Sequence, residues 1–130
     1  MLPSNTGGEL LYTRREPLGV VALVTPWNFP IAIPAWKMAP ALAYGNTVVF
    51  KPASFAPQPA MLLVEVLVEA GLPKGVVNFV TGSGRTVGDT LVGSPKVHGV
   101  SFTGSVSVGA GIYEKAIKNL TRVQLSLLHI

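Results

Sequence analysis

Short apolar runs alternate along this chain with longer segments that have helical spacing. Five runs rich in β-branched residues predict strands over 20–24, 47–50, 76–80, 97–102 and 122–125. The segments between them predict helices over 35–44, 59–70, 86–93 and 107–119. Gly45 stands where the first helix should end, and Gly71 followed by Pro73 ends the second. Apolar strands that alternate with helices are typical of a parallel sheet covered on both faces.

The predicted fold class is therefore α/β, with a Rossmann-like parallel sheet of about five strands and helices on both faces. The first eight residues are polar and rich in glycine, so we expect them to be loosely held. Residues 9–15 are read as a strand or an arm. The expected organisation is a short N-terminal arm over 1–15 and one domain over 16–130.

Polar or glycine-rich loops follow the first four predicted strands, over 25–30, 51–54, 81–85 and 103–105. Parallel sheets bind ligands beyond the carboxyl ends of their strands. The four loops should therefore meet along one edge of the sheet and form a single site.

The loop over 25–30 places Asn28 between two aromatic residues and two prolines. These neighbours restrict the loop, which would hold the side-chain amide of Asn28 as a fixed hydrogen-bond donor. A donor of this kind suits a developing oxyanion. A rigid turn at the exit of a strand is the alternative interpretation, because proline and asparagine are ordinary turn residues.

Two other loops favour a phosphate or a ribose. Lys51 ends a strand and is held extended by Pro52, so its ammonium could reach such a ligand, although a surface lysine is the plainer alternative. Gly104 and Ser105 open a helix whose free N–H groups favour a phosphate, with a simple helix cap as the alternative. Gly82, Gly84 and Gly88 depart by one residue from the G-x-G-x-x-G fingerprint, which therefore fails formally here.

The composition indicates that part of the protein's surface is covered by a partner or by the rest of a larger protein. Hydrophobic residues make up 48% of the chain and charged residues only 12%, against a usual ~25% charged. Apolar surface should therefore meet a partner or the rest of a larger protein. The net charge is +4, but the lysines are scattered, so no nucleic-acid partner is expected. No apolar run reaches the ~18 residues that span a bilayer, so we expect no membrane partner and a cytoplasmic location.

Several chemistries are disfavoured by what the chain lacks. It has no cysteine among its 130 residues, which leaves no disulfide and no thiolate nucleophile. Neither His98 nor His129 has a carboxylate or a second histidine at the spacing of metal ligands, so no metal is predicted. The serines in the loops lack a histidine and aspartate arrangement for hydrolase chemistry.

A series of sequence blocks, in the right order, resembles the aldehyde dehydrogenase superfamily. The matching blocks lie at 16–21, 25–30, 40–49, 51–54, 70–73, 75–78 and 102–109. Within the family the chain looks most similar to the branch that oxidises semialdehydes of sugar-acid breakdown. The resemblance implies a parent reaction in which an aldehyde becomes a carboxylic acid and a hydride passes to NAD or NADP.

The resemblance also implies roles for individual residues. The family's match to Asn28 helps form the oxyanion hole, and the match to Lys51 contacts the adenosine ribose. Ser54 stands where a glutamate usually binds the ribose hydroxyls, so NADP should be tolerated and even preferred. The remaining implied cofactor contacts are Thr25, Pro26 and Trp27 along the cleft, Gly84 near the adenine, and Gly104 and Ser105 at the pyrophosphate.

The sequence departs from the family pattern after Leu125. The family continues into a Glu-Leu-Gly-Gly-Lys block whose glutamate is the general base, whereas Ser126 occupies that place and cannot act as a base at neutral pH. Covalent catalysis also needs the thiolate that is absent. We therefore expect a dinucleotide-binding fragment without dehydrogenase turnover of its own. The alternatives are a non-catalytic assembly module that forms homo-oligomers, or one half of a split enzyme whose catalytic half is another chain.

Overall fold

The structure, a computed structural model, describes residues 7–128. Its strands are β1 (Val20–Val24), β2 (Thr47–Lys51), β3 (Val77–Phe79), β4 (Gly99–Gly104) and β5 (Arg122–Leu127). Its helices are α1 (Ala32–Ala43), α2 (Pro57–Glu69), α3 (Asp89–Val92) and α4 (Val106–Ile117), with a π-helical turn, η1 (Gly84–Gly88), directly before α3. The predicted alternation of strands and helices is confirmed.

The five strands form one parallel sheet in the order β3-β2-β1-β4-β5. β1 is the central strand, where Leu23 lies opposite Phe50 of β2 on one side and Ser101 of β4 on the other. The chain builds the sheet outward from β1 to β3 and then returns across it to begin β4. The predicted α/β, Rossmann-like sheet is confirmed, and its strand order reverses between β1 and β4.

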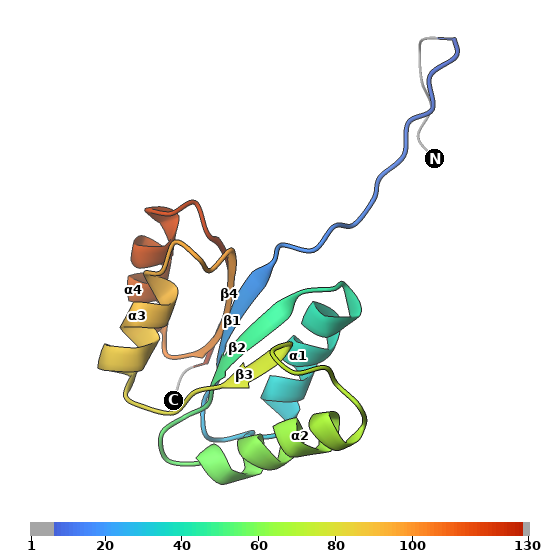
Figure 1. Cartoon of the computed structure of the whole chain (residues 1–130). Helices are drawn as coiled ribbons and strands as arrows, with labels where there is room; N and C mark the ends of the chain where they lie inside the picture. The colour runs from blue at the N-terminus through green and yellow to red at the C-terminus, as the bar shows by residue number, and fades with distance from the viewer. Residues whose placement is uncertain (1–6, 129–130) are drawn as a thin grey trace.

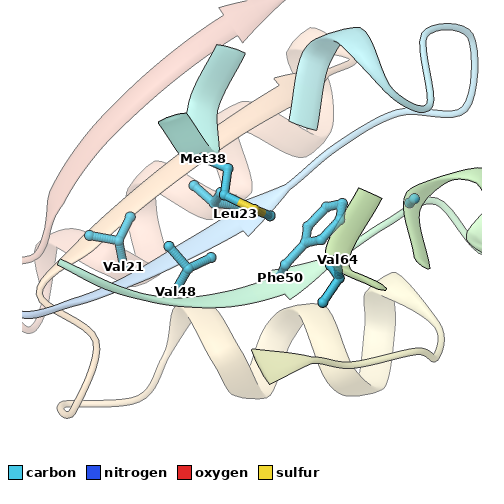
Figure 2. Packing of buried hydrophobic residues seen from close by; sticks show 7 residues of the cluster. Val21, Leu23, Met38, Val48, Phe50 and Val64 are labelled. Atoms are coloured by element: carbon cyan, nitrogen blue, oxygen red, sulfur yellow. The ribbon is translucent and has the colours of Figure 1, made fainter. Parts of the chain in front are cut away.

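Helices α1 and α2 cover one face of the sheet, while α3 and α4 cover the other (Figure 1). The first face packs a cluster in which Leu23 and Phe50 are fully buried and Met38 reaches down from α1 (Figure 2). Val64 of α2 completes this cluster beside Phe50 (Figure 2). Burial of so many large apolar side chains is the main stabilising contribution to this half of the fold.

The second face has its own cluster. Ala22 of β1 and Phe102 of β4 pack there against Val92 of α3 and Ile112 of α4. Since successive residues of a strand point to opposite faces, Ala22 belongs to this cluster while Leu23 belongs to the other.

Several boundaries differ from the predicted ones. Helix α1 begins at Ala32, three residues before the prediction, and contains Pro40 at an exposed position in its interior. Helix α2 begins at Pro57, since proline is well suited to the first helical turn. The helix expected over 86–93 is divided into η1 and α3. His98 was expected within a strand, but β4 begins one residue later at Gly99.

The chain before β1 leaves the sheet as an extended segment (Figure 1). Residues 7–18 are all exposed, and Arg14 and Glu16 form an ion pair at 2.8 Å. The expected division between residues 15 and 16 stays a prediction. Residues 1–6 of the predicted arm and His129 lie outside the described residues.

Candidate functional site

The loops that follow β1, β2, β3 and β4 lie at the carboxyl edge of the parallel sheet, as the sequence predicted. The loop after β1 and the loop after β4 stand on the two sides of the point where the strand order reverses. Ligands of open α/β sheets bind in the crevice at such a point. Asn28, Lys51 and Ser105 therefore belong to one rim of the molecule.

The loop after β1 joins buried and exposed residues. Thr25 is 5% exposed, its backbone N–H donates to the carbonyl of Lys51 at 3.3 Å, and its hydroxyl is buried without a partner. Pro26 is also buried, whereas Trp27 and Asn28 are exposed. The loop is thus hydrogen-bonded to β2 at Thr25, and the side chains of Trp27 and Asn28 are exposed to solvent further along the loop.

Lys51 is a buried cation at the end of β2, only 4% exposed. Its ammonium donates to the carbonyl of Pro52 at 3.0 Å, and its aliphatic stem lies against Gly88, where a Cβ would come within 3.9 Å of it. Burial lowers the pKa of Lys51 because the charged form loses hydration. No carboxylate pairs with Lys51 among residues 7–128. The surface-lysine alternative is therefore wrong, and a buried ammonium is left without an anion.

Ser54 connects the loop after β2 to the loop after β3. Its hydroxyl donates to the carbonyl of Gly82 at 3.0 Å. The two loops line a cavity of about 350 Å³, and the hydroxyl-bearing residues Ser54, Thr81 and Ser83 are part of its lining. Gly82 has a φ of +143°, and a Cβ there would meet Val87 at 2.4 Å, so only glycine fits this position without strain.

Gly84 lines a separate cavity of about 300 Å³ between η1, α3 and α4. Its walls include the apolar side chains of Val92, Val108 and Ile112. A salt bridge of 2.5 Å between Lys115 and Asp89 joins α4 to α3 beside it. A flat apolar ring is the kind of ligand that such walls accept.

Ser105 caps α4, a helix of 12 residues. Its hydroxyl accepts a hydrogen bond from the N–H of Val108 at 3.4 Å, so the simple cap that we considered as an alternative is present. The other N–H groups of the first helical turn have no partner within the helix. Gly104, buried immediately before, stands over the ring of Phe102, where a Cβ would come within 2.5 Å of it.

The sheet separates the predicted residues into two groups. Asn28 lines a cavity of about 590 Å³, which lies on the face covered by α1. Lys51 and Gly84 lie on the opposite face, beside η1 and α3. The rim is shared, but Asn28 does not share a cavity with Ser54 or Gly84.

The sequence interpretation missed a polar cluster in the cavity that Asn28 lines. The ammonium of Lys37, on α1, donates to the hydroxyl of Ser101 at 2.8 Å and to the amide oxygen of Gln124 at 3.5 Å. Burial lowers the pKa of Lys37. In the sequence, Lys37 is one of several scattered lysines, and its position alone indicates no site. The alternation of polar Ser101 and Thr103 with apolar neighbours in β4 was the signal that this face of the strand contributes polar side chains to a cavity.

Together, the strand order and the loops at its reversal define a doubly wound α/β protein. The model of the aldehyde dehydrogenase family matches residues 1–127. The chain belongs to the aldehyde dehydrogenase family, and the resemblance inferred from the sequence blocks is confirmed.

Relatives with assigned activities are similar over most of this chain. It is 57% identical over 129 residues to the 2,5-dioxopentanoate dehydrogenase of Saccharolobus solfataricus, covering 97% of the chain and 27% of that protein. It is 59% identical over 117 residues to the alpha-ketoglutarate semialdehyde dehydrogenase of Haloferax volcanii, covering 90% of the chain and 24% of that protein. The chain thus spans about a quarter of the length of these relatives.

Solved structures of aldehyde dehydrogenases have the same fold over most of this chain. An aldehyde dehydrogenase from Bartonella henselae superposes with a TM-score of 0.85 at 46% identity, over 86% of this chain and 24% of that one. A betaine aldehyde dehydrogenase from Staphylococcus aureus, solved in complex with NAD+, superposes with a TM-score of 0.84 at 43% identity, over 86% of this chain and 22% of that one.

The groups at the rim fit a nicotinamide dinucleotide. Such a cofactor presents phosphates, ribose hydroxyls and a flat base. The rim offers the unpaired ammonium of Lys51, the hydroxyl of Ser54, the N-terminus of α4 after Ser105 and an apolar cavity beside Gly84. In the described part of the chain, no helix has the length and apolar character needed to cross a bilayer.

Proposed function

We propose that these 130 residues form the NAD(P)-binding part of an aldehyde dehydrogenase and bind the dinucleotide by themselves. The observation that supports this most directly is Lys51, a buried ammonium without a carboxylate partner, held at the edge where the strand order reverses. A buried charge is costly unless something pairs with it. A polyanionic or hydroxyl-rich ligand at this edge supplies that partner.

In this proposal the adenosine half of the cofactor lies across η1 and α3. The base enters the apolar cavity beside Gly84 and Val108, and Lys51 contacts the adenosine ribose. Ser54 lies at the neighbouring hydroxyl-lined cavity, where it offers no carboxylate to repel a 2′-phosphate, so NADP is accepted as well as NAD.

The pyrophosphate lies at the loop after β4, because the free N–H groups at the start of α4 and the absence of a side chain on Gly104 favour a close approach. Thr25, Pro26 and Trp27 form the wall of the cleft across the strand reversal. The unpartnered hydroxyl of Thr25 is the polar atom there that a small adjustment of the loop would bring to the ligand.

The parent reaction is oxidation of an aldehyde to a carboxylic acid, and the relatives' names favour a semialdehyde substrate. A bound dinucleotide supplies the hydride acceptor. Asn28, exposed on the α1 side of the rim, donates its amide N–H to the oxyanion that develops on the former carbonyl oxygen of the aldehyde. The thiolate nucleophile must come from outside these residues, since they contain no cysteine. The chain therefore binds the cofactor without oxidising aldehydes.

Calorimetric titration of the 130-residue chain with NADP and with NAD tests the proposal. We expect heat of binding and a raised midpoint of thermal unfolding, because a ligand that binds only the folded state stabilises it. Lys51→Met should weaken binding roughly tenfold, the worth of a charge-assisted hydrogen bond. Arg122→Met, at the opposite edge of the sheet, is the control for the loss of one positive charge.

The proposal fails if millimolar cofactor gives neither heat nor protection from unfolding. It also fails in its assignment of the site if Arg122→Met weakens binding as much as Lys51→Met does.

A second candidate function, self-association as an assembly module, is favoured by one surface of α4. Tyr113, Ile117 and Leu120 recur at a spacing of four and three residues and are 51%, 49% and 88% exposed. This spacing places Tyr113 and Ile117 in one apolar stripe on α4, and Leu120 follows beyond the C-terminal end of that helix. A contiguous apolar stripe of this kind is typical of a surface that another copy covers.

A further inference from the structure

The two edges of the sheet differ in how well they are protected from pairing with another strand. β3, at one edge, has only three residues. β5, at the other edge, has six residues without a proline, and Arg122 at its start is the only charged residue among them. Short edge strands, prolines and charges are the usual features that keep a sheet edge from binding a further strand. β5 is therefore the edge that is open to one.

The backbone of β5 presents unpaired groups along this edge. The N–H groups of Arg122 and Leu128 donate to carbonyl groups at the two ends of the β4 segment, at 3.1 Å and 2.9 Å, so both face β4. Because alternate residues of a strand turn their backbone groups to opposite sides, the N–H and C=O of Val123, Leu125 and Leu127 point away from β4. Among residues 7–128, β5 pairs with no strand besides β4.

A second unpartnered feature lies on the same side of the molecule. Helix α4 packs on β4 and β5, with Ile112 buried against the sheet. One flank of α4 faces α3, where Lys115 forms a salt bridge with Asp89. Tyr113 and Ile117 lie on the opposite flank of the helix and are half-exposed. This flank therefore faces the space beyond the outer edge of β5.

We propose that β5 of one copy pairs antiparallel with β5 of a second copy and joins the two five-stranded sheets into one, an inference that rests on the second candidate function, self-association. A two-fold axis at Leu125 places Val123 opposite the second copy's Leu127. Residues paired in this way exchange both of their backbone hydrogen bonds. Every outward N–H of β5 then meets an outward C=O of the second copy.

The side chains of β5 suit this register. Gln124 lies opposite the second copy's Ser126 on the face of α1, where both residues line the same cavity of their own copy. The apolar residues of β5 meet on the other face, since directly opposite residues share a face. Arg122 lies opposite the second copy's Leu128, so no two like charges are brought together.

The same register brings the two α4 helices side by side. Each lies over β4 and β5, so their axes are separated by two strand spacings, about 10 Å. Packed helices take a separation of this size. The flanks that carry Tyr113 and Ile117 then face each other and cover one another.

Hydrogen exchange of the wild-type backbone amides tests the pairing directly. In the dimer the N–H groups of Val123, Leu125 and Leu127 should exchange roughly tenfold more slowly than in the dilute monomer, because pairing protects them. The N–H groups of Arg122 and Leu128 already face β4, so their exchange should change little with concentration, and they serve as the internal reference.

A proline at the edge provides the matching variant. Leu127→Pro removes one outward N–H from each copy and should raise the dissociation constant of the dimer roughly tenfold, measured by size-exclusion chromatography with light scattering. Proline is tolerated where the N–H faces away from the sheet. Leu127→Ala is the control, because it removes the same side chain, which lies against Gly109, and keeps the N–H. Circular dichroism establishes that each variant is folded.

The outcomes separate this pairing from the proposed functions. A wild-type chain that is monomeric at all accessible concentrations overturns the pairing together with the second candidate function, and leaves cofactor binding untouched. A dimer whose outward amides exchange as fast as those of the monomer overturns the pairing alone. So does a Leu127→Pro variant that dissociates no more than Leu127→Ala. Species larger than a dimer also contradict it, since a two-fold contact of one edge is closed.

Discussion

One buried lysine, Lys51, and one half-buried lysine, Lys37, lie on opposite faces of the sheet. Lys51 ends β2 on the side of η1, and Lys37 projects from α1 toward Ser101 and Gln124. Burial lowers the pKa of both side chains. Each is therefore more easily deprotonated than a lysine in water. Each ammonium also donates hydrogen bonds to oxygen atoms on its own side of the sheet.

Replacing Lys37 by Met should reduce the rise in stability of the protein at alkaline pH. Because burial lowers the pKa of Lys37 below its ordinary 10.5, the unfolded chain binds more protons than the folded one between the two values. The free energy of unfolding therefore rises as the pH rises through that window, and Lys37→Met lacks this contribution. Urea unfolding at about pH 8 and about pH 10 measures the difference.

The exposed Lys96, replaced by Met in the same way, controls for the loss of one charge. A Lys37→Met variant with the same pH dependence as the wild type would show that burial does not perturb this lysine.

At the scale of elements, the loop after β3 depends on one glycine. Gly82→Ala should destabilise the protein by about 1–3 kcal/mol and weaken cofactor binding, because the residue has a φ of +143° and its Cβ would strike Val87 at 2.4 Å. Gly84→Ala is the matched variant two residues away, where a Cβ would meet nothing within 4 Å and the backbone is ordinary. We expect its stability within about 0.5 kcal/mol of the wild type.

Thermal unfolding and the same calorimetric titration measure both variants. Similar losses in Gly82→Ala and Gly84→Ala would contradict the strain argument and indicate that any side chain in this loop is harmful.

The strands were predictable from sequence because each is a short run of apolar β-branched residues, and this signal depends on burial on both faces. The position of the loops was predictable because a parallel sheet places the carboxyl ends of all its strands at one edge. The starts of α1 and α2 were misplaced because proline reads as a helix breaker but is accepted in a first helical turn, at Pro34 and at Pro57. The division of 86–93 into η1 and α3 left no local pattern to detect.

The site was only partly predictable. Sequence order placed Asn28, Lys51 and Ser105 on one rim, but it could not show that the first faces a different cavity from the second. That distinction depends on which face each side chain takes, and a single residue of register reverses it. Lys37 was missed because its partners, Ser101 and Gln124, come from strands far away in sequence.

For the whole molecule, the exposed apolar surface predicts association. Ile117→Lys should raise the monomeric fraction at a given concentration, since it places a charge in the apolar stripe that Ile117 forms with Tyr113 on α4. Size-exclusion chromatography with light scattering measures the fraction. Glu114→Lys, at an exposed polar position of the same helix, is the control.

A wild-type protein that is monomeric at all accessible concentrations would contradict the assembly role of this stripe. Equal dissociation by Glu114→Lys would instead indicate a general effect of added positive charge.

The central position of β1 has a consequence for how the molecule comes apart. Val21 and Leu23 belong to the hydrophobic cluster under α1 and α2, and Ala22, between them, belongs to the cluster under α3 and α4. β1 is also the strand through which the two halves of the sheet are hydrogen-bonded to each other. Loss of this one strand would therefore disrupt both layers at once, so the carboxyl edge of the sheet and the two hydrophobic clusters should unfold together.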